Sequence, residues 1–180
     1  MGLDIYAASH LRHVCPPGGD EFNRLEELTN AQGKCLDEVY FLLHPNDEGW
    51  ESQLGGMEPG LYEFTPTTQQ HDFRVGSYGR YNEWRERLSQ YALGAPPKAV
   101  WDSPEEYAGK PFVELVNFTD CDGRIGSRVA TKLAADFRDH AADFERFVAG
   151  AADADGCLYV YREFAIAFGL AEQQGALQFC

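Results

Sequence analysis

The start of the chain follows a two-residue period, with the apolar Leu3, Ile5 and Ala7 at alternate positions. This period is typical of a strand with one buried face, so the pattern predicts a strand over residues 2–8. Shorter apolar runs, bounded by residues that favour turns, predict strands over residues 39–43, 61–65, 72–75 and 176–179. For residues 39–43, a helix extending from Leu36 fits the pattern as well.

The densest apolar run covers residues 112–118 and reads Phe-Val-Glu-Leu-Val-Asn-Phe. Its β-branched and aromatic residues predict a central, buried strand. Residues 119–126 are predicted to form a turn after this strand. Residues 46–60 are rich in Gly, Pro, Asp and Glu, which is typical of a loop.

Other segments place apolar residues three and four positions apart, the period of an amphipathic helix. Capping residues and glycines then predict where these helices begin and end. The predicted helices run from an Asp20 N-cap to near Gly33, from near Ser77 to Gly94, briefly after Ser103, from a Ser127 N-cap through Val148, and from before Tyr161 to near Gly175.

These elements together predict an α+β fold, in which a small mixed or antiparallel sheet packs against about four helices. At 180 residues the chain has the usual size of one domain, and we expect residues 1–180 to form a single domain. A hydrophobic fraction of 44% is ordinary for a globular protein, so most of the chain should be ordered.

The charge is strongly one-sided, since 15 Lys and Arg stand against 29 Asp and Glu, a formal net charge of −14. Such a field repels the phosphates of nucleic acids and anionic membrane surfaces, so no nucleic-acid or membrane partner is expected. The acidity either serves solubility or attracts a basic protein partner. Five widely spaced cysteines without a Cys-x-x-Cys pair fit free thiols in a reducing compartment, so we expect a soluble, cytoplasmic protein.

Residues 74–85 are the most informative stretch for function. Two glycines, Gly76 and Gly79, let the backbone approach a ligand, and a helix beginning there presents free N–H groups to an anion. Arginines add positive charge within an otherwise acidic chain. In the alternative interpretation, the glycines shape a turn and the aromatic residues fill the core. The spacing fits neither a Walker A loop nor a dinucleotide fingerprint.

A second candidate site follows residues 112–118, where Asp120 and Asp122 precede Gly123. Calcium loops carry carboxylates at such spacing, but the first and twelfth positions here are apolar. Residues 153–156 repeat the incomplete pattern, so Asp-Gly turns are the simpler interpretation and no metal site is predicted. The group of His10, His13 and Cys15 lacks a fourth zinc ligand at a suitable spacing.

Three segments resemble a family of uncharacterised bacterial and phage proteins. They read Met-Gly-Leu-Asp-Ile-Tyr at residues 1–6, Gly-Ser-Tyr followed by Tyr-Asn within residues 76–82, and Val-Glu-Leu-Val-Asn-Phe through Asp-Cys to Ile-Gly within residues 113–126. The resemblance covers a minority of the chain, and its last segment is the most specific. It implies membership of a recurrent small family and no activity.

We therefore carry two functional hypotheses, neither of which identifies a cofactor or a reaction. The first is a ligand-binding or enzymatic domain that holds a small anionic or phosphate-bearing molecule between the helix start at residues 76–85 and the turn at residues 120–126. The second is a non-enzymatic, acidic interaction protein, for example a phage or host-defence inhibitor, that binds a basic protein partner. The ligand-binding residues of the first hypothesis are Ser77, Tyr78, Arg80, Asn82, Arg85, Asp120 and Asp122.

Overall fold

The computed structural model describes residues 2–180, which form two antiparallel sheets and six α-helices. The strands are β1 (Gly2–Ala8), β2 (Leu11–Cys15), β3 (Tyr40–Leu43), β4 (Gly60–Phe64), β5 (Gln70–Ser77), β6 (Gly123–Gly126) and β7 (Ala176–Phe179). The helices are α1 (Asp20–Ala31), α2 (Tyr78–Leu93), α3 (Pro97–Asp102), α4 (Val113–Val116), α5 (Ser127–Val148) and α6 (Ala154–Ala171). Short 3-10 helices cover Leu36–Glu38, Glu51–Leu54 and Pro104–Tyr107.

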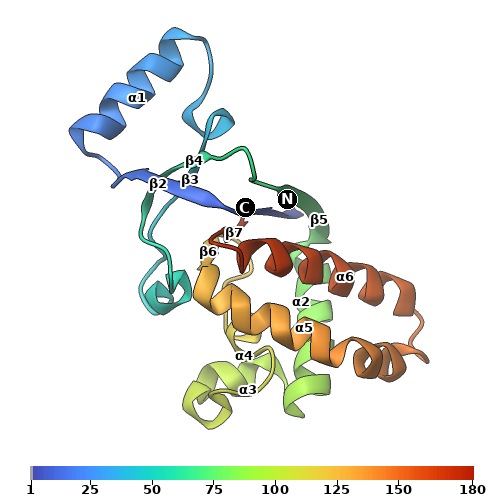
Figure 1. The fold of residues 1–180 in the computed structure, drawn as a ribbon. Coiled ribbons are helices and arrows are strands. Elements are labelled where there is room, and N and C mark those ends of the chain that lie inside the picture. Colours follow the sequence, from blue (N-terminus) through green and yellow to red (C-terminus); the bar gives the residue numbers. More distant parts are fainter. Residues whose placement is uncertain (1) are drawn as a thin grey trace.

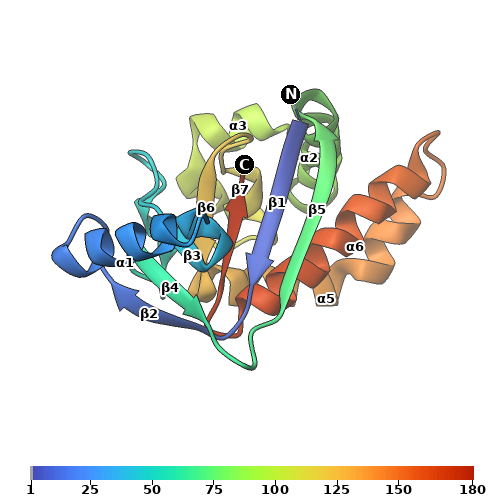
Figure 2. The same cartoon turned by 90° about the horizontal axis from the view of Figure 1, so that it is seen from above.

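The larger sheet has the strand order β5-β1-β7-β6, and helices α2, α5 and α6 cover one of its faces (Figures 1 and 2). Side chains alternate between the two faces of a strand, so every second residue meets these helices. Ile5 pairs with Phe73 on one side and with Phe179 on the other, and all three are buried. The main core therefore lies between this face of the sheet and the three helices.

The smaller sheet, β2-β4-β3, packs against the end of the larger one through buried residues that include Phe41, Tyr62 and Ala176. Helix α1 follows β2 and lies at the far end of the molecule from α5 and α6 (Figure 1). Only Thr29 of α1 is fully buried, while Phe22 and Leu25 are half-buried. The helix is thus held by one narrow apolar edge.

The α+β fold predicted from the sequence is confirmed, with fully antiparallel sheets. The helix predicted to begin near Ser77 does so, because the Ser77 hydroxyl accepts a hydrogen bond from the Arg80 amide and caps α2. The other two predicted N-caps were placed one residue late. Gly126 caps α5 and Gly19 caps α1, so Ser127 and Asp20 are the first helical residues.

The strand predicted over residues 112–118 is wrong. Phe112 has a left-handed backbone with φ of 60°, and the four residues after it form α4. The Phe112 amide donates to the Asp136 carboxylate at 2.8 Å, and its ring packs on Phe137 with centroids 4.9 Å apart. Leu115 and Val116 are buried as expected, but a helical turn directs them into two different clusters, one in the main core and one with Val100.

Two strands were missed. Gly123–Gly126, placed in the predicted turn, pairs with β7 as strand β6. Leu11–Cys15 was not predicted to form a strand at all, yet it pairs with β4. Both strands are short. In β6 two glycines interrupt the alternation of apolar and polar residues that marks a strand, and in β2 the adjacent polar residues Arg12 and His13 interrupt it.

Gly175, just before β7, occupies a position that excludes any side chain. A Cβ there would lie 1.9 Å from the Ala8 carbonyl oxygen, whereas a Cβ at Gly169 in α6 would meet nothing within 4 Å. We expect Gly175→Ala to destabilise the fold by about 1–3 kcal/mol, because β7 must move away from β1. Gly169→Ala should stabilise it by about 0.5–1 kcal/mol through helix propensity. Urea denaturation of both variants measures the difference, and losses of equal size would contradict the packing argument.

Candidate functional site

The structure brings together three of the residues predicted to form an anion site. The Asn82 amide of α2 donates to the Asp120 carboxylate at 2.7 Å. The Arg85 guanidinium donates to the Asn82 carbonyl oxygen and, at 2.6 Å, to the Phe118 backbone oxygen. It also lies 4.0 Å from the Asp120 carboxylate. The two segments singled out in the sequence therefore meet, through bonds between their own side chains.

Arg85 is closed off from solvent within this network. The residue is 3% exposed, and its guanidinium carbon lies 5.1 Å from the Tyr81 ring centre and 4.9 Å from that of Trp101. Two aromatic faces and two oxygen acceptors thus surround its charge, an arrangement that stabilises a buried cation. In residues 2–180, Arg85 Nε and the Tyr81 hydroxyl have no hydrogen-bond partner. The network fixes the loop before β6 against α2 and does not present Arg85 to a ligand.

The remaining predicted site residues lie outside this network. Ser77 serves as the helix cap, and Tyr78 packs against the main core. Arg80 is exposed and lines a cavity of about 180 Å³ beside Asp153 and Gly156 at the start of α6. Asp122 pairs with Arg124 at 2.9 Å. The structure therefore brings Asn82, Arg85 and Asp120 into contact and places the other four predicted residues elsewhere.

The structure also places the other titratable and metal-ligating residues of the chain. Within residues 2–180, no three His, Cys, Asp or Glu side chains gather as they would to hold a metal ion. His71, which precedes Asp72 in the chain, points to the helix-covered face and pairs with Glu163 of α6 at 2.8 Å. All five cysteines are free thiols.

The face of the larger sheet opposite the helices carries a row of polar residues. Asp72, Tyr6, Gln178 and Arg124 are register partners across β5, β1, β7 and β6, so their side chains lie side by side on one face. Figure 2 shows that α2, α5 and α6 all lie behind this sheet, which leaves the polar face uncovered along β5 and β1, whereas Arg124 on β6 is buried. The smaller sheet and α1 lie beside this face and project away from it, and together we call them the wall (Figure 1).

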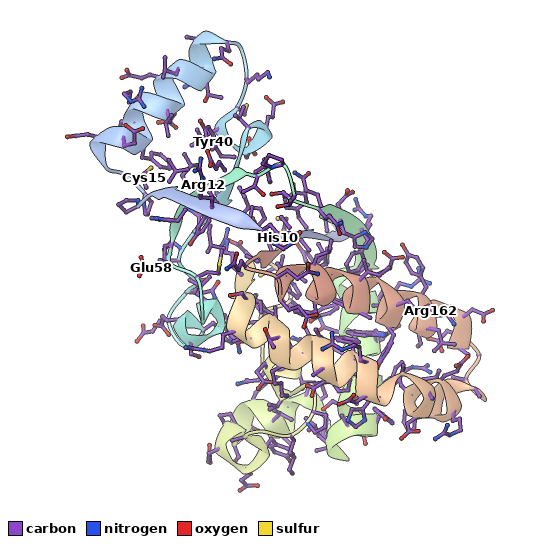
Figure 3. The ribbon with its side chains drawn as sticks, in the orientation of Figure 1. His10, Arg12, Cys15, Tyr40, Glu58 and Arg162 are labelled. Atoms are coloured by element: carbon purple, nitrogen blue, oxygen red, sulfur yellow. The ribbon has the colours of Figure 1, made fainter. Side chains whose placement is uncertain are left out.

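A groove of about 480 Å³ lies where this uncovered face meets the wall, and we call it the α1 groove. Its aromatic surface includes Tyr6, whose ring stacks on that of Phe41 at 5.6 Å, together with Phe22 and Tyr40. Tyr40 lies next to α1 in Figure 3. The complete lining is Tyr6, Phe22, Glu26, Leu36, Asp37, Tyr40, Phe41, Leu42, His44, Gln178 and Cys180.

The α1 groove is acidic. Glu26 and Asp37 line it, and neither belongs to any ion pair within residues 2–180. Partial burial, followed by the charge of Arg124, lowers the pKa of His44, so this imidazole is neutral at pH 7. Burial raises the pKa of the Cys180 thiol, which therefore stays protonated. At neutral pH the lining carries carboxylates and no cation.

Sequence reasoning missed this groove because its residues come from separate parts of the chain: β1, α1, the segment around β3, and β7. The alternation in residues 2–8 did indicate that Tyr6 and Ile5 face opposite ways. Nothing local to the sequence says which face of a sheet the helices cover. The groove is a product of tertiary packing.

Within residues 2–180, no helix is both long and apolar enough to cross a membrane. Comparison of the chain with protein-family models, with curated proteins and with solved structures finds no match.

Proposed function

We propose that the protein is a non-enzymatic interaction protein that binds a basic segment of a protein partner in the α1 groove. The observation that carries this proposal is the lining itself, which combines four aromatic rings with two unpaired carboxylates and no cation at neutral pH. A Lys or Arg side chain of the partner would lie over the ring of Tyr6 or Tyr40. Its charge would then be close to a carboxylate.

The energetics of such a contact favour a cationic side chain over an anion. A cation over an aromatic face contributes about 0.5–1 kcal/mol at an exposed site, and more as water is excluded. Glu26 and Asp37 add a short-range attraction, and the net charge of −14 steers a basic partner toward the protein from a distance. The net charge would repel an anion at long range.

The open sheet face beside the groove favours a protein segment over a small cation. Beyond Tyr6 and Gln178, the uncovered face continues to exposed Asp72 and to the exposed Asp4–Arg74 pair. Neighbouring residues of a partner chain can lie along this face while one basic side chain occupies the groove. The anionic-ligand hypothesis for residues 76–85 and 120–126 is weaker, because Arg85, the arginine nearest to Asp120, already has partners within the protein.

A peptide titration tests the proposal. We expect an arginine-rich peptide to shift the amide NMR signals of Tyr6, Tyr40 and Gln178, and the double variant Glu26→Gln/Asp37→Asn to weaken binding by about three- to tenfold, since each exposed ion pair contributes up to about 1 kcal/mol. Glu27→Gln/Glu48→Gln is the matched control, because it removes the same charge from exposed residues that do not line the groove.

The outcomes separate a specific groove from general charge attraction. If both double variants weaken binding equally, or if the shifts spread over the whole surface, the partner is attracted by net charge alone and the groove assignment fails. Raising salt from about 0.05 to 0.5 M should weaken the complex in every case, because the Debye length shortens to a few ångströms.

A further inference from the structure

The larger sheet ends on one side in β5, and the outer backbone edge of this strand is open. β5 is the last strand in the order β5-β1-β7-β6 and, with eight residues, the longest strand within residues 2–180. Figure 2 shows it at the border of the sheet, with no further strand beside it. Half of its backbone hydrogen-bonding groups therefore face away from the sheet.

The pairing of β1 identifies which groups of β5 these are. The amide and carbonyl of Asp4 bond to Cys180, at 3.1 and 2.9 Å, and so point toward β7. Backbone groups alternate in direction along an antiparallel strand, so the next residue, Ile5, bonds to Phe73 on the other side. The residues of β5 with outward amides and carbonyls are therefore Gln70, Asp72 and Arg74. Within residues 2–180 these outward groups have no hydrogen-bond partner.

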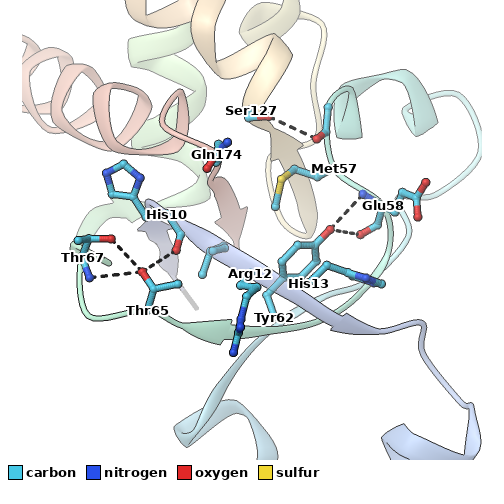
Figure 4. Close-up of a pocket in the computed structure, with 12 residues that line it drawn as sticks. His10, Arg12, His13, Met57, Glu58, Tyr62, Thr65, Thr67, Ser127 and Gln174 are labelled. Carbon is cyan, nitrogen blue, oxygen red and sulfur yellow. Dashed lines mark hydrogen bonds between the residues drawn. The ribbon is translucent and has the colours of Figure 1, made fainter.

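The other edge strands are shorter, and two of them carry features that oppose pairing. The Asn46 side chain covers the outer edge of β6, because it donates to the Arg124 carbonyl and accepts from the Arg124 amide, both at 2.7 Å. β2, which borders the cavity in Figure 4, has five residues and a bulge within them, and β3 has four residues. Covered edges and bulges keep other chains from pairing with a sheet. In β5 the only bulge is at Val75, which leaves residues 70–74 straight and open.

An apolar surface of α6 lies next to this open edge. Tyr159, Glu163 and Ile166 are four and three residues apart and so share one face of the helix. The Glu163 carboxylate bonds to the His71 imidazole of β5 at 2.8 Å, which places this face beside the edge. Figure 2 shows α6 passing behind β5 and continuing beyond it. Tyr159 and Ile166 are 49% and 50% exposed, so a strand added to β5 would cover them.

We propose that the open edge of β5 binds an extended segment of a partner protein, which adds a strand to the larger sheet. The segment would bond to the outward backbone groups of residues 70–74, and its side chains would alternate between the two faces of the sheet. Those on the helix side would be apolar, because they would lie against Tyr159 and Ile166. The side chain opposite Asp72 would be basic, because Asp72 is exposed and belongs to no ion pair within residues 2–180.

A different protein fits this edge better than a second copy of the chain. Two copies, each with a net charge of −14, repel one another. The apolar residues of β5, Phe73 and Val75, are buried in their own core and could not cover Tyr159 and Ile166 of another copy. The open edge shares no residue with the α1 groove, so this site is independent of that one.

A short strand-forming peptide, acetyl-Thr-Ile-Lys-Ile-Thr-amide, tests the proposal. In antiparallel pairing its lysine lies opposite Asp72 and its isoleucines point toward α6. We expect an NMR titration to shift the amide signals of Gln70, Asp72 and Arg74 and the methyl signals of Ile166. N-methylation of the lysine amide, which points to β5 in this register, should weaken binding by at least about tenfold. N-methylation of the second isoleucine amide, which points to solvent, should change it by less than about twofold.

Variants of the protein separate the backbone edge from the apolar surface. Asp72→Pro removes an outward amide at a position where edge strands tolerate proline, and it should weaken binding by more than about tenfold. Ile166→Ala should weaken it by about two- to fivefold, because less apolar area is buried. Leu28→Ala is the matched control, since Leu28 is 48% exposed and lies in α1, away from β5. Urea midpoints verify that each variant folds, and the two N-methylated peptides decide the question on the unmodified protein.

Equal affinity for the two N-methylated peptides would overturn the proposal, as would equal losses in Ile166→Ala and Leu28→Ala. A dimer of the protein alone that Asp72→Pro dissociates would assign the edge to a second copy and overturn it as well. Glu26→Gln/Asp37→Asn should leave the affinity for this peptide within about twofold, since surface charges at a distance are screened. Failure at the α1 groove and failure at the β5 edge are thus told apart.

Discussion

Truncation of Phe164 to alanine should lower the free energy of unfolding by about 3–5 kcal/mol, the usual cost of removing a large aromatic side chain from a packed core. Phe164 in α6 has no exposed surface and lies at the centre of the aromatic core. Its ring stacks on Trp84 with centroids 5.0 Å apart and meets Phe73 edge-on at 5.1 Å. Its other aromatic neighbours are Tyr81, Phe137, Phe168 and Phe179.

Ile166 gives a matched control on the same helix, because its side chain is 50% exposed and packs against none of these rings. Ile166→Ala should cost less than about 1 kcal/mol, since little apolar surface is lost from the interior. Denaturant midpoints and slopes of the two variants measure the contrast. Comparable losses would mean that the sheet and helices α2 and α6 do not share one core.

The helices were the most predictable part of this fold. Residues 127–148 and 161–171 carry apolar stripes at helical spacing, and α5 and α6 bury those stripes against each other and the sheet. The helical period of apolar residues is visible in the sequence because one face of each helix is exposed to solvent and polar. The first strand was predictable for the same reason, with Ile5 inside and Tyr6 on the uncovered face.

Residues 112–118 failed because the segment is buried on more than one side. A continuous apolar run is compatible with a buried strand or with a buried helical turn, and its periodicity does not distinguish them. In the structure the Phe112 amide donates to Asp136 of α5, which lies 24 residues further along the chain. The local sequence of residues 112–118 does not indicate this contact.

The candidate sites were likewise predictable from local sequence only in part. The sequence indicated that the segments around Arg85 and Asp120 carry unusual chemistry, and the structure brings them together. It did not indicate that Arg85 would be enclosed by Tyr81 and Trp101, because Trp101 lies in α3, a helix that was not predicted. The α1 groove assembles from several elements, so only the fold reveals it.

Arg85→Ala should destabilise the protein by about 2–4 kcal/mol, because it leaves a buried carbonyl without its donor and opens a void between two aromatic rings, while the Asp120 side chain is 38% exposed. The Phe118 carbonyl would lose its charged donor, and Asn82 would lose the guanidinium that fixes its orientation toward Asp120. The space between the rings of Tyr81 and Trp101 would also be left empty. The loop before β6 should then become the first part of the chain to exchange its amide hydrogens.

Arg80→Ala is the natural comparison, since Arg80 lies in the same helix but is exposed, and it should change stability by less than about 0.5 kcal/mol. Chemical denaturation together with hydrogen exchange measures both effects. A stable Arg85→Ala variant that binds phosphate less tightly than the wild type would return Arg85 to the role of a ligand-binding residue. A strongly destabilised Arg85→Ala variant assigns this arginine to the architecture of the fold.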